Sequence, residues 1–149
     1  MPPYTGSILN NQGFEFHNWP GPGEEAAAFF GLSHAVVVPP NARRVIIGGQ
    51  VGIRDDGTIP NDIVEEIDVA FEHVERALKA AGLPEKNAWE YVYRVRTYEI
   101  PAEGLHAAVK EAAGKYLVTT RPAWTGLAIA GLFSPELHIE IEVEAFVPE

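Results

Sequence analysis

Three glutamates near the C-terminal end are spaced as alternate residues of a strand. From His138 to Phe146, most residues alternate between an apolar and an acidic side chain. The acidic residues are Glu140, Glu142 and Glu144, and the apolar residues are Ile139, Ile141, Val143 and Ala145. A period of two indicates a strand with one buried face. A carboxylate on its other face is either solvated or able to orient and activate water in a cleft. The spacing leaves both interpretations open.

The histidine and serine side chains are further candidates for catalytic groups. The five histidines form no i,i+4 pair and no H-E-x-x-H pattern, so no metal site is predicted. His34 follows Ser33 in a predicted strand and could face a site. His138 shares the predicted face of Glu140, and the two could act as an acid–base pair. The chain has no G-x-S-x-G motif, and Gly48-Gly49 lacks the spacing of a phosphate-binding loop.

Arginine side chains are candidates for binding an anionic substrate, because one guanidinium can hold a carboxylate. Arg94 and Arg96 share one face of a predicted strand, where they are either surface charge or substrate ligands. Arg121 directly precedes Pro122, which favours an extended backbone, and is a third candidate.

The composition fits one globular domain spanning residues 1–149, with 46% hydrophobic and 21% charged residues. A formal net charge of -10 argues against nucleic acid and anionic membranes as partners. The absence of cysteine excludes disulfides and thiolate chemistry. We find no signal peptide and no apolar run near the about 18 residues that a membrane span needs. A cytoplasmic protein is therefore expected.

The order of predicted elements indicates an α+β fold. Residues 1–23 are rich in Gly, Pro and Asn and are expected to form an irregular N-terminal arm with one short strand near 14–16. Strands are predicted at 33–38, 43–53, 89–98, 124–130 and 138–146, and helices at 63–81 and 102–116. Two helices should cover one face of a mostly antiparallel sheet. If the other face is apolar, a second subunit must cover it, so we expect an oligomer.

Four short motifs, taken in order, resemble the Rid family, the YjgF-type reactive-intermediate deaminases. They are IGGQ at 47–50, AAGL at 80–83, Pro122-Ala123 before a short strand, and IEIE at 139–142. The similarity runs from about Gly31 to the end of the chain. It implies a chorismate-mutase-like fold and a homotrimer with sites in clefts between subunits. It also implies hydrolysis of small imines or enamines, such as 2-aminoacrylate, with no metal or organic cofactor.

The resemblance assigns Glu140 the role of the family's water-orienting glutamate. Ser33, Thr125 and Gly49-Gln50 also match the family pattern. Typical deaminases carry an arginine after Pro-Ala that binds the substrate carboxylate through two hydrogen bonds, and here that residue is Trp124. An indole offers one N–H and no charge, so it cannot replace a guanidinium.

Other positions near this site also depart from the family pattern. Leu32 replaces a tyrosine, Gly48 replaces a serine, and His34 replaces a glutamine. Trp124 adds apolar and stacking surface where the family has a charge. The sequence therefore predicts a small-molecule cleft rebuilt for a larger or less charged substrate than 2-aminoacrylate. Leu32, Gly48 and Trp124 would shape the pocket.

In this hypothesis Glu140 is the acid–base group. Ser33, His34 and Thr125 would supply hydrogen bonds, and Arg121 lies on the other side of the Pro-Ala turn. Two other functions stay open. The chain could bind a small molecule or a partner protein on a scaffold whose deaminase site has decayed, which the loss of the arginine favours. It could also be a structural oligomer whose glutamates are simply solvated.

Overall fold

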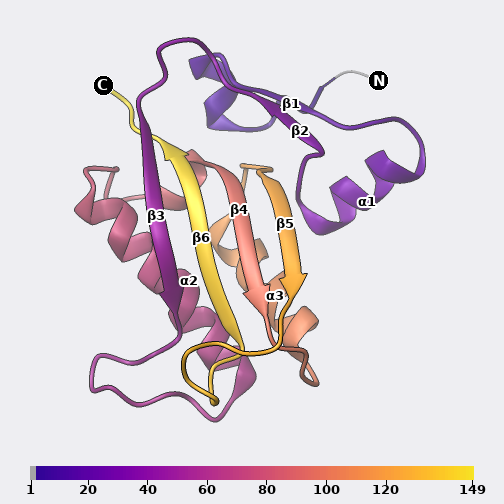
Figure 1. The fold of residues 1–149 in the computed structure, drawn as a ribbon. Coiled ribbons are helices and arrows are strands. Elements are labelled where there is room, and N and C mark those ends of the chain that lie inside the picture. Colours follow the sequence, from indigo (N-terminus) through magenta and orange to yellow (C-terminus); the bar gives the residue numbers. More distant parts are fainter. Residues whose placement is uncertain (1–2) are drawn as a thin grey trace.

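A four-stranded sheet covered by two helices dominates residues 3–149, the part of the chain that this computed structural model describes (Figure 1). The elements in chain order are η1 (Ile8–Gln12), β1 (Glu15–His17), α1 (Pro22–Phe30), β2 (Ala35–Val37), β3 (Arg44–Val51), α2 (Ile63–Ala80), η2 (Ala88–Tyr91), β4 (Val92–Glu99), α3 (Leu105–Tyr116), β5 (Ala123–Ala128) and β6 (Ile139–Phe146). The main sheet has the order β3-β6-β4-β5, and β1 pairs with β2 in a separate sheet.

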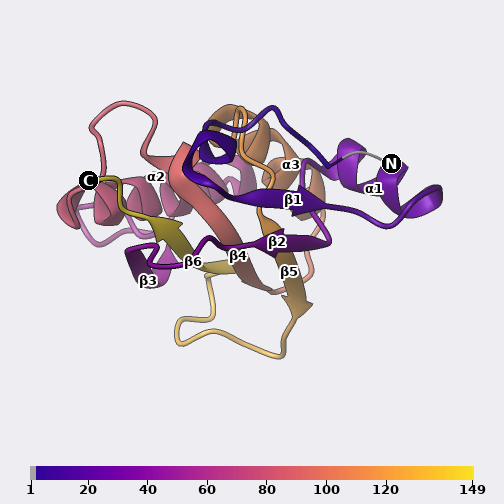
Figure 2. The same ribbon diagram turned by 90° about the horizontal axis from the view of Figure 1, so that it is seen from above.

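The alternating strand β6 lies inside the sheet, antiparallel to β3 on one side and β4 on the other. Its apolar residues are buried and its glutamates are half-buried on the opposite face, as the period of two predicts. Figure 2 shows α2 and α3 together on one side of the sheet. The predicted α+β class is confirmed. The sheet is mixed, because β5 returns parallel to β4 after the crossover through α3.

Helix α2 follows its predicted range closely. The Asp62 side chain accepts a hydrogen bond from the Glu65 backbone N–H, which caps the first turn. The apolar stripe of the helix, Ile67, Ala70, Phe71, Val74 and Leu78, is buried in the main core. Among residues 3–149, no helix has the length and apolar character that crossing a bilayer requires.

Two local predictions differ from the structure. The strand expected at 89–98 begins at Val92, because η2 turns the Trp89 side chain into the core, where its indole N–H donates to the Phe71 carbonyl at 3.0 Å. Helix α1 was not predicted, because Phe29 and Phe30 are exposed and do not form a buried stripe. Its sequence signals are Pro22 in the first turn and Gly31 at the C-terminal end, with a φ of 70°.

The segment expected to be an irregular arm contains η1 and β1 in its described part. The strand predicted near residues 14–16 is confirmed as β1, which pairs with β2. A second apolar cluster of Leu9, Phe14, Phe16, Tyr93 and Phe146 anchors this segment to the main sheet.

Two buried glutamates hold the segments that lead into the last two strands. The Glu90 carboxylate accepts hydrogen bonds from the backbone N–H groups of Thr119 (2.8 and 3.0 Å) and Thr120 (3.0 Å), just before β5. The Glu66 carboxylate accepts the backbone N–H of His138 at 2.6 Å, just before β6, and lies 2.7 Å from the ring Nδ1 of the same histidine. The two carboxylates accept hydrogen bonds from backbone N–H groups that have no carbonyl acceptor in these turns.

Replacing Glu90 by alanine should therefore destabilise the fold. Glu90→Ala leaves the N–H groups of Thr119 and Thr120 without an acceptor, which should cost about 2 to 4 kcal/mol in the free energy of unfolding. Urea titration measures this loss. Glu85→Ala is the matched control, because the Glu85 side chain is 89% exposed and should change stability by no more than about 0.5 kcal/mol. Equal losses in the two variants would contradict the role given to Glu90.

Candidate functional site

The carboxylate of Glu140 rests on a glycine of the neighbouring strand. The pairing of β3 with β6 is irregular between Ile47 and Gln50, and Gly48 and Gly49 occupy this bulge. A Cβ atom at Gly49 would overlap the Glu140 carboxylate, whereas one at Gly48 would meet nothing within 4 Å. Gly49 therefore creates the space in which Glu140 lies. This explains why the chain needs glycine at this position.

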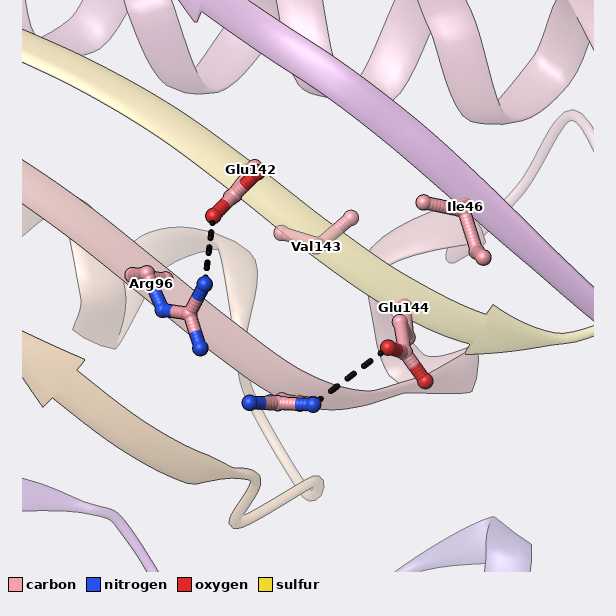
Figure 3. Close-up of a pocket in the computed structure, with 6 residues that line it drawn as sticks. Ile46, Arg96, Glu142, Val143 and Glu144 are labelled. Carbon is pink, nitrogen blue, oxygen red and sulfur yellow. Dashed lines mark hydrogen bonds and ion pairs between the residues drawn. The ribbon is translucent and has the colours of Figure 1, made fainter.

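The other two glutamates of β6 have partners from β4. Glu142 accepts a hydrogen bond from Arg96 at 3.0 Å (Figure 3). It accepts another from the Tyr98 hydroxyl at 2.6 Å. Glu144 accepts one from the Tyr93 hydroxyl at 3.0 Å and also lies near arginines of β3 and β4. Burial and this hydrogen bond raise the pKa of Tyr93 to about 12, so the hydroxyl remains a donor at neutral pH.

Glu140 differs from these two glutamates. Among residues 3–149, the structure shows hydrogen bonds to Glu142 and Glu144 and none to the Glu140 carboxylate. Its oxygens are thus available to a water molecule or a ligand. The spacing of the three glutamates could not separate them, because the arginines that pair with two of them come from other strands.

Trp124 lies on the opposite face of the sheet from Glu140. It pairs in register with Val95, whose side chain is buried beneath the helices. Its indole N–H donates to the Thr97 hydroxyl at 3.2 Å, and that hydroxyl donates to the Glu99 carboxylate at 2.6 Å. Trp124, Thr97 and Glu99 therefore form one hydrogen-bonded chain on the helix-covered face.

Trp124 and Glu99, the two ends of this hydrogen-bonded series, line a cavity of about 620 Å³ between α3, β5 and the end of α1. Most of the large side chains around it are apolar: Phe30, Leu32, Leu105, Val109, Trp124 and Leu127. Its charged or titratable groups are Glu99, His106 and Lys110. A mostly apolar cavity with a few polar groups is the usual form of a small-molecule site.

The structure brings together only some of the residues that the sequence predicted. Leu32 and Trp124 both line the cavity. Ser33, which follows Leu32, is buried, and its hydroxyl has no hydrogen-bond partner among the described residues. Gly48 and Thr125 are exposed; Thr125 pairs with Arg96 of β4, which lies on the face that carries Glu140.

Three other predicted groups have different neighbours. The His34 ring stacks on Trp19, with 4.6 Å between ring centroids. The Arg121 guanidinium lies 3.9 Å above the Tyr4 ring. Neither residue lines the cavity. The ring of His138, considered as a partner of Glu140, instead pairs with Glu66.

Sequence reasoning missed Thr97 and Glu99. The sequence did contain a signal for them. Thr97 and Glu99 follow Val95 by two and four residues, so the two-residue period of a strand places them on the same buried face of β4. Polar side chains at such positions need partners, and here they bond one another. Within residues 3–149, no three His, Asp or Glu side chains are grouped as a metal ion would require.

Comparison with known proteins bears on the family and the fold of the chain. The family model described as Endoribonuclease L-PSP matches residues 24–147. A crystal structure of YyfB from Yersinia pestis, a Rid-family protein of unknown function, is 28% identical with a TM-score of 0.69, covering 80% of this chain and 90% of that one. No curated protein matches the sequence.

Two further solved structures are similar to the chain. Rv2704 from Mycobacterium tuberculosis, of the YjgF/YER057c/UK114 family, is 25% identical with a TM-score of 0.57, covering 90% of this chain and 99% of that one. RidA from the Antarctic bacterium Psychrobacter sp. is 22% identical with a TM-score of 0.62, covering 77% and 87%. At that identity, the likeness to RidA supports the shared fold alone.

The contact between Gly49 and Glu140 predicts a local effect without unfolding. Gly49→Ala should turn the Glu140 carboxylate away, because the overlapping atoms belong to the free end of a flexible side chain. We expect a change of less than about 1 kcal/mol in stability and a displaced carboxylate, measured by urea titration and crystallography. Gly48→Ala is the control and should leave Glu140 in place. An unmoved Glu140 in Gly49→Ala would contradict this account.

Proposed function

We propose that this protein hydrolyses a small reactive imine or enamine. The proposal starts from its family, because the chain belongs to the Endoribonuclease L-PSP family and is a Rid/YjgF-type protein. The observation that supports this most is the Glu140 carboxylate, which lies over Gly49 and has no hydrogen-bond partner among residues 3–149, unlike Glu142 and Glu144. A carboxylate available in this way can act as a general acid and base.

The site is proposed to require two copies of the chain. Trp124 and its cavity lie on one face of the sheet, and Glu140 lies on the other. Side chains on opposite faces of one sheet cannot close on one small molecule. A cleft between neighbouring subunits of a homotrimer would solve this, with Trp124 and Leu32 from one copy and Glu140, Gly48 and Thr125 from the next.

The proposed reaction balances without a cofactor. Glu140 takes a proton from water as the water oxygen bonds to the imine carbon. The electron pair of the C=N double bond moves to nitrogen, which takes the proton from Glu140. As C=O forms and the C–N bond breaks, Glu140 takes the hydroxyl proton and returns it to the departing nitrogen, which leaves as ammonia. Glu140 returns to its starting state, and the sum is imine plus water giving carbonyl compound plus ammonia.

RNA is not the proposed substrate, although the family description includes the word endoribonuclease. A net charge of -10 repels a phosphate backbone. The arginines Arg94 and Arg96 are paired with glutamates of β6. The substrate is also proposed to be larger or less charged than 2-aminoacrylate, because Trp124 stands where the carboxylate-binding arginine would be. A cytoplasmic location stays a prediction.

Changing Glu140 to glutamine tests the mechanism. Glu140→Gln keeps the shape but cannot accept the proton of water, so ammonia release from a panel of imines should fall at least about 100-fold. Size-exclusion chromatography with light scattering should show an unchanged oligomer. Glu142→Gln is the control on the same face, and we expect it to retain turnover. Activity that survives in Glu140→Gln would contradict the mechanism.

A second candidate function is binding without catalysis, favoured by the loss of the arginine at position 124. Trp124→Arg tests what that loss removed. If the scaffold is otherwise complete, this variant should gain ammonia release from 2-aminoacrylate generated in situ, because a guanidinium can hold its carboxylate. An inactive wild type and an inactive variant, both still binding an aromatic ligand, would favour the binding protein.

A further inference from the structure

We propose that the cavity between α3 and β5 binds an organic cation, a protonated amine or iminium on an apolar body, with Glu99 as its counter-ion. The inference rests on the proposed function only in that it concerns the same cavity. It changes the substrate class from amino-acid-derived imines, which carry a carboxylate, to imines derived from apolar amines.

The hydrogen-bond chain at the base of the cavity has a fixed direction. The Trp124 indole donates to Thr97, and Thr97 donates to the Oε2 atom of Glu99. Both donors are used within the chain, because indole and hydroxyl have one proton each. These three hydrogen-bonded side chains therefore present an acceptor to the cavity, the remaining Glu99 oxygen, and no spare donor. Their hydrogen bonds also hold the carboxylate in place.

The second oxygen of Glu99 accepts no hydrogen bond from residues 3–149 and can bind a ligand. The basic group nearest to it among these residues is the His106 Nε2 atom, 3.8 Å from Oε1, which is too far for a hydrogen bond. The His106 side chain is 91% exposed, whereas that of Glu99 is only 14% exposed. Water therefore screens the histidine while the carboxylate lies inside the cavity. A buried carboxylate is stabilised by a cation that comes within hydrogen-bond distance.

The remaining cation of the lining lies at the rim. The Lys110 ammonium sits 3.7 Å above the ring of Phe29, a residue that is 62% exposed. An anionic ligand would reach this lysine only at the mouth and would meet the Glu99 charge at the base. Charge complementarity thus favours a ligand whose positive end points inward.

Two further features suit a cation at the base. The Trp124 ring lines the cavity, and the face of an indole attracts an ammonium or iminium group. Gly126 leaves room for the hydrogen bond that fixes Glu99, because a Cβ atom there would lie 3.1 Å from the Glu99 Oε2 atom and 3.3 Å from the Thr97 hydroxyl. The apolar walls would surround the rest of the ligand.

Three probes of similar shape and different charge test the proposal by isothermal titration calorimetry on the full-length protein. They are phenethylamine, 2-phenylethanol and 3-phenylpropionate at neutral pH. We expect phenethylamine to bind at least about tenfold more tightly than the alcohol, and the carboxylate to bind most weakly. Equal binding of amine and carboxylate, tighter binding of the carboxylate, or no binding of the amine would overturn the proposal.

Variants then assign the preference to Glu99. Glu99→Gln can still accept the Thr97 hydrogen bond but lacks the charge, so the affinity for phenethylamine should fall about tenfold while that for 2-phenylethanol is unchanged. Glu103→Gln is the control, because Glu103 is exposed and outside the cavity, and it should change neither affinity. Retained amine preference in Glu99→Gln would overturn the assignment.

If Glu99→Gln fails to fold, judged by circular dichroism, Gly126→Ala provides a second test, because its Cβ atom would press on the hydrogen bond between Thr97 and Glu99 and displace the carboxylate. It should weaken phenethylamine more than 2-phenylethanol, and an unchanged preference would overturn the proposal. Binding is measured without turnover, so the two hypotheses fail separately. Preference for the amine with no hydrolysis of any imine would contradict the proposed function alone. Hydrolysis combined with carboxylate preference would contradict the cation site alone.

Discussion

The two-residue period of β6 is the constraint on which the rest of the structure depends. This strand lies between β3 and β4, so its apolar face must be buried by the helices and its acidic face must point the other way. A shift of one residue would bury three carboxylates. The same period places Glu140 opposite the cavity that contains Trp124, which is why one copy of the chain cannot assemble both groups around a small molecule.

The chain uses its carboxylates in three different ways. Glu142 pairs with an arginine and a tyrosine on the sheet surface. Glu66 and Glu90 are buried and bind backbone N–H groups before the last two strands, so they position the residues that follow. Glu140 and Glu99 each keep an oxygen that no described residue binds closely, and these two are the ones to which we assign chemistry. Local partners, more than residue type, separate structural from functional acids.

The ligand that we propose for the cavity follows from one residue, Trp124, set on a shared fold. An arginine at position 124 would place a positive charge beside Glu99 and Thr97. The tryptophan instead donates its one proton to Thr97 and leaves the negative charge of Glu99 facing the cavity. With a neutral side chain at position 124, the Glu99 carboxylate has no positive charge beside it there to offset its own. Fold likeness alone would not reveal this difference.

Local patterns in the sequence were enough to predict β6, α2 and the α+β class, because burial of one face imposes a period that the chain itself displays. The sequence also singled out Trp124 and Glu140, through motifs that resemble a family. It did not predict α1, whose phenylalanines are exposed. It also did not predict the role of Glu99, because the cavity that this residue lines is built from three other elements, although its partner Thr97 is on the same strand. Only the tertiary structure decided which glutamates are paired and which are free. Hydrogen bonds and ion pairs depend on distances between residues far apart in the chain, and no local pattern contains those distances.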